Sequence, residues 1–211
     1  MSQASSTSIE RFIERENIAL FQRRMAEEAD ENRRRLLTIL LTEARARLAV
    51  IEARAFGARR APTVDTPAPY RGGPELDRSF REEFESTDKP LLLIDPGPGL
   101  RIVDANAAYV AATMIDRDGV KGRELFEVFP DNPGDPVPTG VANLFASLAE
   151  VVRVKRPHAM DIQRYDIRNA AGVFVERHWQ PLNMPILGAS GEPVLILHQV
   201  IDVTSQVLGR N

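Results

Sequence analysis

A proline- and glycine-rich stretch divides the chain into two parts that cannot share one pattern of secondary structure. Residues 61–74, APTVDTPAPYRGGP, hold four prolines and two glycines, whereas residues 8–56 contain neither. Proline fixes φ and removes a backbone donor, so this stretch cannot hold a helix and is typical of a semi-extended linker. We therefore predict three regions: a helical part over 1–60, a linker over 61–85 and a C-terminal domain over 86–211.

The N-terminal part is predicted to form two helices, with Asp30 as the N-cap of the second. Apolar residues of the second helix recur at i, i+3, i+4 and i+7: Leu37, Leu40, Leu41, Ala44, Leu48, Ile51 and Ala55. Two helices of this length cannot enclose a core by themselves. We expect an α-helical hairpin or a coiled coil, with each apolar stripe packed against its neighbour, the C-terminal domain or a second copy of the chain.

Charge and composition exclude several classes of protein. The net charge is −3, with +3 on residues 1–60 and −6 on the rest. Arg33–Arg35 and Arg59–Arg60 could contact phosphate, but neighbouring glutamates favour a solvated helix face. The absence of cysteine excludes disulfides, thiolate zinc sites, iron–sulfur clusters and cysteine nucleophiles. No apolar run has the length of a membrane span or a signal peptide, so we expect a cytoplasmic protein without a membrane partner.

The C-terminal part alternates short β-rich runs with turns and helices. The expected order is strands at 91–95 and 100–106, helices at 107–114, 122–130 and 140–154, then strands at 158–167, 172–186 and 193–203. Thr139 is the predicted cap of the longest helix. This order predicts an α+β fold: an antiparallel sheet of five strands with helices on one face.

Four local motifs occur in an order that resembles a known family. IVDAN ends a strand at Asn106, GRELFEVFPDNP begins at Gly122, ERHWQPLNMPI contains Trp179, and the last strand closes on Asp202-Val203-Thr204. Together they resemble the PAS domain, in particular a bacterial sensory subgroup, here preceded by an N-terminal helical pair. The resemblance implies a sensory or interaction module. Its small pocket can hold haem, flavin, a small acid or nothing, and its signals leave through terminal helices, usually across a dimer.

The resemblance also implies where a ligand and a signal would act. The candidate ligand-binding residues come from the long helix, the segment before it and the last three strands: Phe129, Leu144, Leu148, Tyr165, Trp179 and Leu195. An ordinary hydrophobic core is the competing interpretation of these residues. Asp202 and Thr204 are the candidate signal-coupling residues, with turn and cap chemistry as their alternative role. Because only seven residues follow Thr204, we expect the signal to leave through the N-terminal helices or the sheet face.

Cofactor chemistry finds little support in the residues present. A flavin photosensor that forms a cysteine adduct is excluded because the chain has no cysteine. Haem is disfavoured because His158, His178 and His198 all fall in predicted strands, whereas haem-binding PAS domains place the ligand on the long helix. No histidine spacing indicates a metal site. The cofactor therefore remains unassigned.

The sequence favours a non-enzymatic signal-transduction module. No phosphate-binding loop, nucleophile elbow or kinase signature is present, so no catalytic residue is assigned. The favoured function is sensing, dimerisation or both, as a homodimer that regulates a two-component partner such as a histidine kinase or response regulator. The first alternative is a sensor of a small ligand or cofactor such as haem, flavin or a metabolite. The second is a nucleic-acid-associated regulator that uses the arginine-rich N-terminal helices, which the net negative charge disfavours.

Overall fold

The computed structural model of the protein describes residues 2–55, 76–169 and 171–209 and confirms the α+β class with an antiparallel sheet. The helices are α1 (Ser2–Glu27), α2 (Glu31–Ala55), α3 (Arg78–Ser86), α4 (Ala107–Thr113), α5 (Arg117–Val120), α6 (Leu125–Val128), α7 (Gly140–Val154) and α8 (Thr204–Val207). The strands are β1 (Leu91–Ile94), β2 (Ile102–Ala105), β3 (His158–Ala159), β4 (Gln163–Arg164), β5 (Ile167–Arg168), β6 (Phe174–Val175), β7 (His178–Leu187) and β8 (Pro193–Asp202). Residues 61–75 of the predicted linker and Arg59–Arg60 lie outside the described residues.

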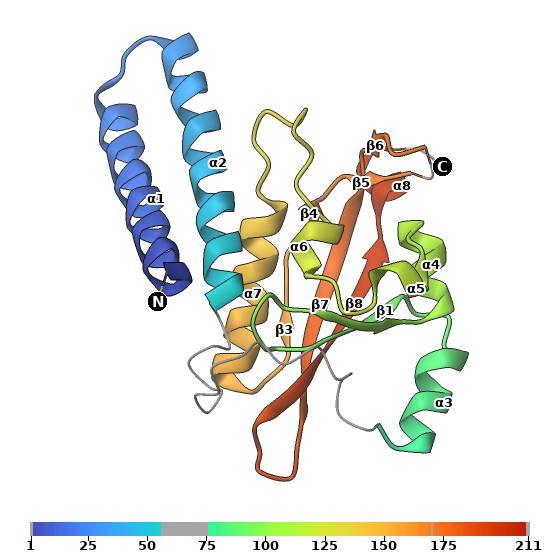
Figure 1. Ribbon diagram of the computed structural model, residues 1–211. Helices are drawn as coiled ribbons and strands as arrows, with labels where there is room; N and C mark the ends of the chain where they lie inside the picture. Colours follow the sequence, from blue (N-terminus) through green and yellow to red (C-terminus); the bar gives the residue numbers. More distant parts are fainter. Residues whose placement is uncertain (1, 56–75, 170, 210–211) are drawn as a thin grey trace.

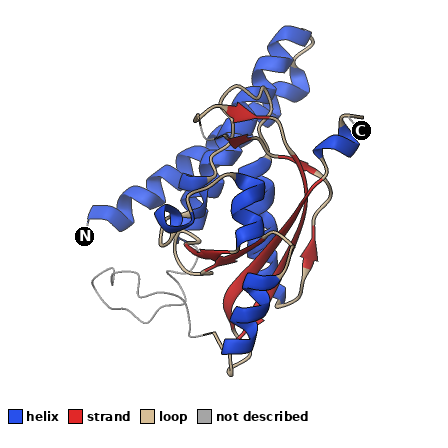
Figure 2. Ribbon diagram, turned by 90° about the vertical axis from the view of Figure 1, so that its right-hand side faces the viewer, coloured by secondary structure: helices blue, strands red, loops and turns tan. Residues whose placement is uncertain are grey.

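Helices α1 and α2 form the predicted hairpin. They lie side by side and antiparallel, and the end where they join extends beyond the rest of the molecule (Figures 1 and 2). Asp30 caps α2 as expected, because its Oδ1 accepts a hydrogen bond from Arg33 N at 2.9 Å. Two ion pairs join the helices, Arg15 to Glu52 at 2.8 Å and Arg47 to Glu14 at 3.0 Å.

The main sheet has the order β2-β1-β8-β7, with β3 and β4 both paired to β7 at the far edge. Five strands were predicted, and five positions are present, but the edge strand expected over 158–167 is broken into short pieces. The third piece, β5, leaves this sheet and pairs with β6 instead. The long pair β7 and β8 forms the twisted centre of the sheet (Figure 2).

Proline explains why the edge is broken while the centre is not. Met160 N donates to Pro181 O at 3.0 Å, so the main-chain groups of Pro181 point toward the edge. Pro181 cannot return a hydrogen bond there because it has no N–H. Pro185 lies an even number of residues further along β7, so its main-chain groups face the same edge. Neither proline therefore removes a hydrogen bond between β7 and β8, and only the edge pairing is weakened.

The sheet buries apolar side chains on both faces. Leu92 and Ile94 of β1 and Ile196 of β8 join the main core beneath α7, which contributes Leu148 and Val151. The opposite face holds a second cluster in which Phe84 of α3 packs with three strand residues: Leu91, Leu93 and Leu195. The helices of the predicted fold cover the face of the main core, and α3 adds cover on part of the second face.

Helix α3 was not predicted and lies at the end of the segment assigned to the linker. Asp77 caps it, since its Oδ1 accepts from Phe80 N at 2.9 Å. Phe80 and Phe84 are four residues apart and stack with their ring centroids 6.4 Å apart, so both face the sheet. The pattern of two phenylalanines in RSFREEFES was the signal for an amphipathic helix.

The hairpin is joined to the domain through the main core. Ala49 and Ala53 of α2 are buried among the residues beneath α7. Gly99 N donates to Ala53 O at 3.0 Å, and Arg54 pairs with Glu124 at 3.0 Å. Small residues at this contact let the helix approach closely, so α2 and α7 pack as neighbours (Figure 1).

Candidate functional site

A small cavity lies between the sheet and the helices α4, α6 and α7. Its volume is about 50 Å³. Its walls are mostly apolar and come from residues far apart in the sequence: Tyr109, Thr113, Leu125, Phe129, Gly140, Leu144, Met160, Gln163, Tyr165, Ile167, Trp179, Pro181, His198 and Val200. Known ligand pockets span roughly 300–1,000 Å³. The cavity therefore has room for a ligand of a few heavy atoms, and a haem or flavin would require it to open.

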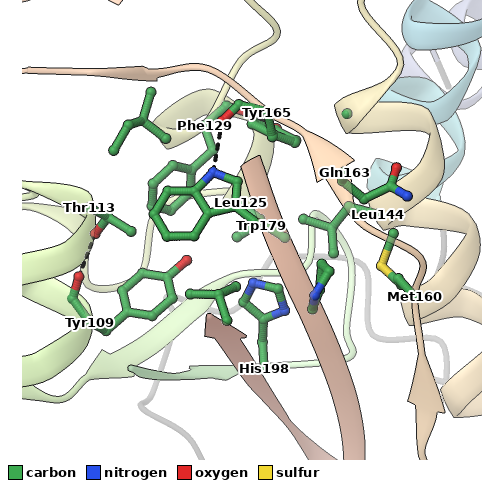
Figure 3. Close-up of a pocket in the computed structure, with 14 residues that line it drawn as sticks. Tyr109, Thr113, Leu125, Phe129, Leu144, Met160, Gln163, Tyr165, Trp179 and His198 are labelled. Carbon is green, nitrogen blue, oxygen red and sulfur yellow. Dashed lines mark hydrogen bonds between the residues drawn. The ribbon is translucent and has the colours of Figure 1, made fainter. Parts of the chain in front are cut away.

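The structure brings together four of the six candidate ligand-binding residues. Phe129, Leu144, Tyr165 and Trp179 line the cavity (Figure 3). Leu148 is fully buried in the main core, and Leu195 lies in the cluster on the opposite face of the sheet. Neither contributes to the cavity wall. Ligand contact by any of the six remains a prediction.

Apart from Tyr165 and Trp179, the polar side chains of the cavity were not selected from the sequence. Within the described part of the chain two of them, Tyr109 and His198, have an atom free to bond a ligand. Tyr109 is 3% exposed, and its hydroxyl points into the cavity (Figure 3). No hydrogen-bond partner of this hydroxyl occurs among the described residues, and burial raises the pKa of Tyr109. His198 is also 3% exposed and lies edge-on to the Tyr109 ring, with the centroids 6.1 Å apart. Together they give an apolar cavity two groups that can bond a ligand.

His198 belongs to a chain of hydrogen bonds that reaches the surface. Its Nδ1 lies 2.6 Å from Asn183 Oδ1, and Asn183 Nδ2 donates to Ser147 Oγ at 2.7 Å. Ser147 Oγ lies 2.8 Å from Nδ1 of His158, which is exposed on β3. Burial lowers the pKa of His198 to about 4, so its ring is neutral near pH 7.

Asn106 holds Tyr109 in place. It follows the strand β2 and caps the helix α4, where its Oδ1 accepts from Tyr109 N at 2.9 Å. The same oxygen accepts from Leu91 N at 3.0 Å, and Nδ2 donates to the carbonyls of Phe84 and Lys89 at 3.1 and 2.8 Å. One buried amide thus joins α3, β1 and α4. The cap spacing places Tyr109 on the first turn of α4, a signal that could have identified it.

Gly140 and Tyr165 pack against each other and close one side of the cavity. A side chain at Gly140 would overlap the Tyr165 ring. The Tyr165 hydroxyl donates to Phe129 O at 2.5 Å, and Trp179 Nε1 donates to Tyr165 O at 2.8 Å. The predicted cap, Thr139, occupies the N-cap position of α7 but makes no side-chain cap bond. That bond comes from Asp131, whose Oδ1 accepts from Val141 N at 3.0 Å.

A second hollow, the hairpin cleft, lies on the other side of the same wall. It measures about 500 Å³. It is bounded by α1 and α2 on one side and by the segment before α7 on the other: Ile13, Glu14, Ala46, Arg47, Val50, Ile51, Arg54, Phe126, Pro130, Asp131 and Val141. Burial is the largest cause of the raised pKa of Asp131, and the nearby Asp135 adds to it. Leu125 and Gly140 line the cavity, and their neighbours Phe126 and Val141 line the hairpin cleft, so the two hollows share α6 and the first turn of α7.

The two candidate signal-coupling residues fix the start of β7 against the end of β8. Thr204 Oγ1 accepts from His178 N at 2.9 Å, and Asp202 Oδ1 accepts from Thr204 N at 2.9 Å. Asp202 also faces Arg177 at 3.5 Å. This is turn chemistry around the short helix α8, and a part in signalling remains a prediction.

The remaining polar candidates do not converge. Arg33–Arg35 lie at the start of α2, away from the cavity, and His178 pairs with Glu176 at 3.0 Å. Within residues 2–55, 76–169 and 171–209, no three histidine or carboxylate side chains form a metal site. In the same ranges, no helix combines the length and apolarity needed to cross a membrane.

Comparison with known proteins identifies similar solved structures and a matching family model. Three similar solved structures are the Rhodobacter sphaeroides LOV protein, with 16% identity over 60% of this chain and 69% of that chain; a Colwellia psychrerythraea PAS domain, with 14% over 61% and 97%; and the Bordetella pertussis BvgS PAS domain, with 22% over 63% and 90%. Their TM-scores are 0.47, 0.46 and 0.45. No curated protein matches the chain. The model of the PAS fold family matches residues 84–208, more than half of the chain. The chain therefore belongs to the PAS fold family of signal-sensing modules.

Proposed function

We propose that this PAS protein is a non-catalytic sensor in which the state of the cavity sets the position of the α1–α2 hairpin. The observation that carries the proposal is the shared wall. Leu125 and Phe129 line the cavity, whereas Phe126 and Pro130, each the next residue along the chain, line the hairpin cleft. Close-packed interiors transmit displacement. A ligand that enlarges the cavity must move this segment, and the hairpin cleft moves with it.

The ligand would be small and polar at one end. Tyr109 supplies a hydroxyl donor and His198 a ring nitrogen. The other polar side chains of the wall, Thr113 and Gln163, already bond protein groups, and the remaining wall is mostly apolar. Native mass spectrometry of freshly purified protein tests for a resident ligand, and an absorption spectrum tests for haem or flavin. A polypeptide without added mass would favour a module that works through partner binding alone.

The transmission step has a direct test because the chain contains no cysteine. Gln22→Cys on α1 and Ser190→Cys between β7 and β8 place two spin labels at exposed positions. Adding Leu144→Trp overfills the cavity, because the indole is larger than the space available, and we expect the distance distribution between the labels to shift beyond its original width. Leu197→Trp, which overfills the cluster on the opposite face, is the matched control and should leave the distribution in place. An unchanged distribution in a folded Leu144→Trp protein contradicts the proposal.

A second copy of the chain is the partner that α1 best fits. Phe12, Ile13 and Leu20 are 64%, 47% and 38% exposed, so α1 presents apolar side chains that the hairpin leaves uncovered. A two-fold axis near Leu20 would place Glu16 of one copy opposite Arg24 of the other, which makes the face complementary to itself. Light scattering at micromolar concentration should give a dimer that Phe12→Ser with Leu20→Ser converts to a monomer. A monomeric parent protein would leave a different signalling protein, such as a histidine kinase or response regulator, as the partner.

A further inference from the structure

We propose that the surface histidine His158 sets, through Ser147 and Asn183, whether His198 presents a hydrogen-bond acceptor or a donor to the cavity. This inference rests on the proposed function, because it concerns the selectivity of the same cavity. It assigns a specificity-determining part to three residues outside the cavity wall. The hydrogen-bond chain that joins them to His198 is called the relay below.

The relay has a fixed direction when His158 is neutral. An amide oxygen only accepts, so the short contact to Asn183 Oδ1 requires a proton on His198 Nδ1. Asn183 Nδ2 donates to Ser147 Oγ, and the serine hydroxyl then donates to Nδ1 of His158. His198 Nε2 therefore carries no proton. Among the described residues, this nitrogen has no hydrogen-bond partner, so the cavity offers an acceptor.

Protonation of His158 reverses every bond of the relay. A proton from solvent on His158 Nδ1 turns that nitrogen into a donor to Ser147 Oγ. Ser147 Oγ has His158 and Asn183 as its partners, so its own hydrogen is paired only if the Asn183 amide turns by 180°, which places Oδ1 against the serine and Nδ2 against His198. His198 releases its Nδ1 proton and takes up one at Nε2, so its charge is unchanged. The net uptake is one proton, at His158, and the cavity now offers a donor.

Burial confines the relay to these two states. Ser147, Asn183 and His198 are 2%, 0% and 3% exposed, so water cannot replace a mismatched partner without cost. A buried donor or acceptor left without a partner costs roughly 1–3 kcal/mol. One reversed bond in the middle of the relay is therefore unfavourable, and the bonds reverse together.

The charged groups around His158 are paired with one another or exposed to solvent. Glu150 of α7 faces the ring, and it is itself bound by Arg153 at 2.8 Å. Lys155, in the turn before β3, pairs with Glu192 at 2.6 Å, and Arg156 is exposed. The residues of β7 beside the ring, Leu182–Met184, carry no charge. At the other end, the titratable neighbour of His198 is Tyr109.

Nitrogen-15 NMR of the three histidine rings tests the relay without any ligand. At pH 8 we expect His198 to carry its proton on Nδ1. As the pH falls to 5.5, the Nε2 resonance should move to the protonated position, with the midpoint of the His158 titration. The low pKa of His198 keeps its ring neutral over this range, so a change of tautomer is distinguishable from a change of charge.

Three variants complete the test. His158→Gln and Ser147→Ala should each hold His198 in one tautomer from pH 8 to 5.5. His178→Gln, which removes the histidine outside the relay, should leave the transition unchanged. A His198 tautomer that stays constant while His158 titrates would overturn the inference, as would the same transition in His158→Gln. A failed hairpin displacement on overfilling the cavity would instead contradict the proposed function, so the two failures are distinguishable.

Discussion

Asn106 is the residue whose replacement should cost the domain the most for a single side chain. Its amide makes four hydrogen bonds to main-chain groups of α3, the turn after it, β1 and α4. Asn106→Ala leaves all four main-chain groups without this partner at a site that is 0% exposed. At roughly 1–3 kcal/mol for each orphaned group, with partial relaxation, the expected loss is about 4–6 kcal/mol. A domain of this kind is stable by about 5–15 kcal/mol, so the variant should be close to unfolding.

Chemical denaturation followed by the fluorescence of Trp179, the single tryptophan, measures this loss. Asp77→Ala is the matched control, because Asp77 caps the exposed start of α3 with a single main-chain bond. It should cost about 1 kcal/mol, the usual value for an N-cap. Asn106→Asp keeps the acceptor bonds but turns an oxygen toward two carbonyls, so it should also cost several kcal/mol. A loss below about 2 kcal/mol for Asn106→Ala would show that Asn106 acts as a cap alone, and the network argument would fail.

Two further predictions concern the cavity. The folded pKa of His198, about 4, lies below the usual value of about 6.5. The unfolded chain therefore binds more protons between these values, and stability is lost as the pH falls through this window. Chemical denaturation at pH 7 and at pH 5 measures the free energy of unfolding at each pH. From pH 7 to pH 5, the parent should lose about 2 kcal/mol more of this free energy than His198→Phe, and equal losses would contradict a buried neutral ring. Gly140→Ala should displace Tyr165. Overpacking of this kind costs about 1–3 kcal/mol, which lowers the melting temperature by roughly 2–10 °C. An unchanged melting temperature and an unchanged Trp179 emission spectrum would show that Tyr165 moves aside without cost.

The order of elements in the C-terminal part was predictable because its signals are local. The run LLLID, the cap at Asn106 and the apolar stripe of α7 each depend on neighbouring residues. The hairpin was predictable for the same reason, since a segment free of glycine and proline carries helical periodicity up to Ala55. Local patterns of this kind determine which elements form.

The failures arose where distant residues decide the structure. The edge strand is broken by Pro181, which lies on β7 and is about twenty residues away in sequence from β3 and β4. Leu195 fits the alternation of side chains between the two faces of β8. Only the packing of α3 shows that its face of the sheet lies opposite the cavity. His198 has the sequence context of an ordinary strand histidine. Its place in a buried chain of hydrogen bonds depends on Asn183 and Ser147, which no local sequence pattern joins to it.

Helix α7 is the element on which both proposals converge. Val141 faces the hairpin cleft, Leu144 faces the cavity, and Ser147 belongs to the relay. These residues follow one another at intervals of three, so they occupy successive turns of one helix of 15 residues. A continuous helix in a close-packed core moves as a unit, because separate adjustment of one turn would break its own main-chain bonds. A ligand that displaces Leu144 must therefore strain the Ser147 contact to His158 and change the width of the hairpin cleft together. If the spin-label distance and the His198 tautomer respond independently to overfilling of the cavity, α7 does not couple them.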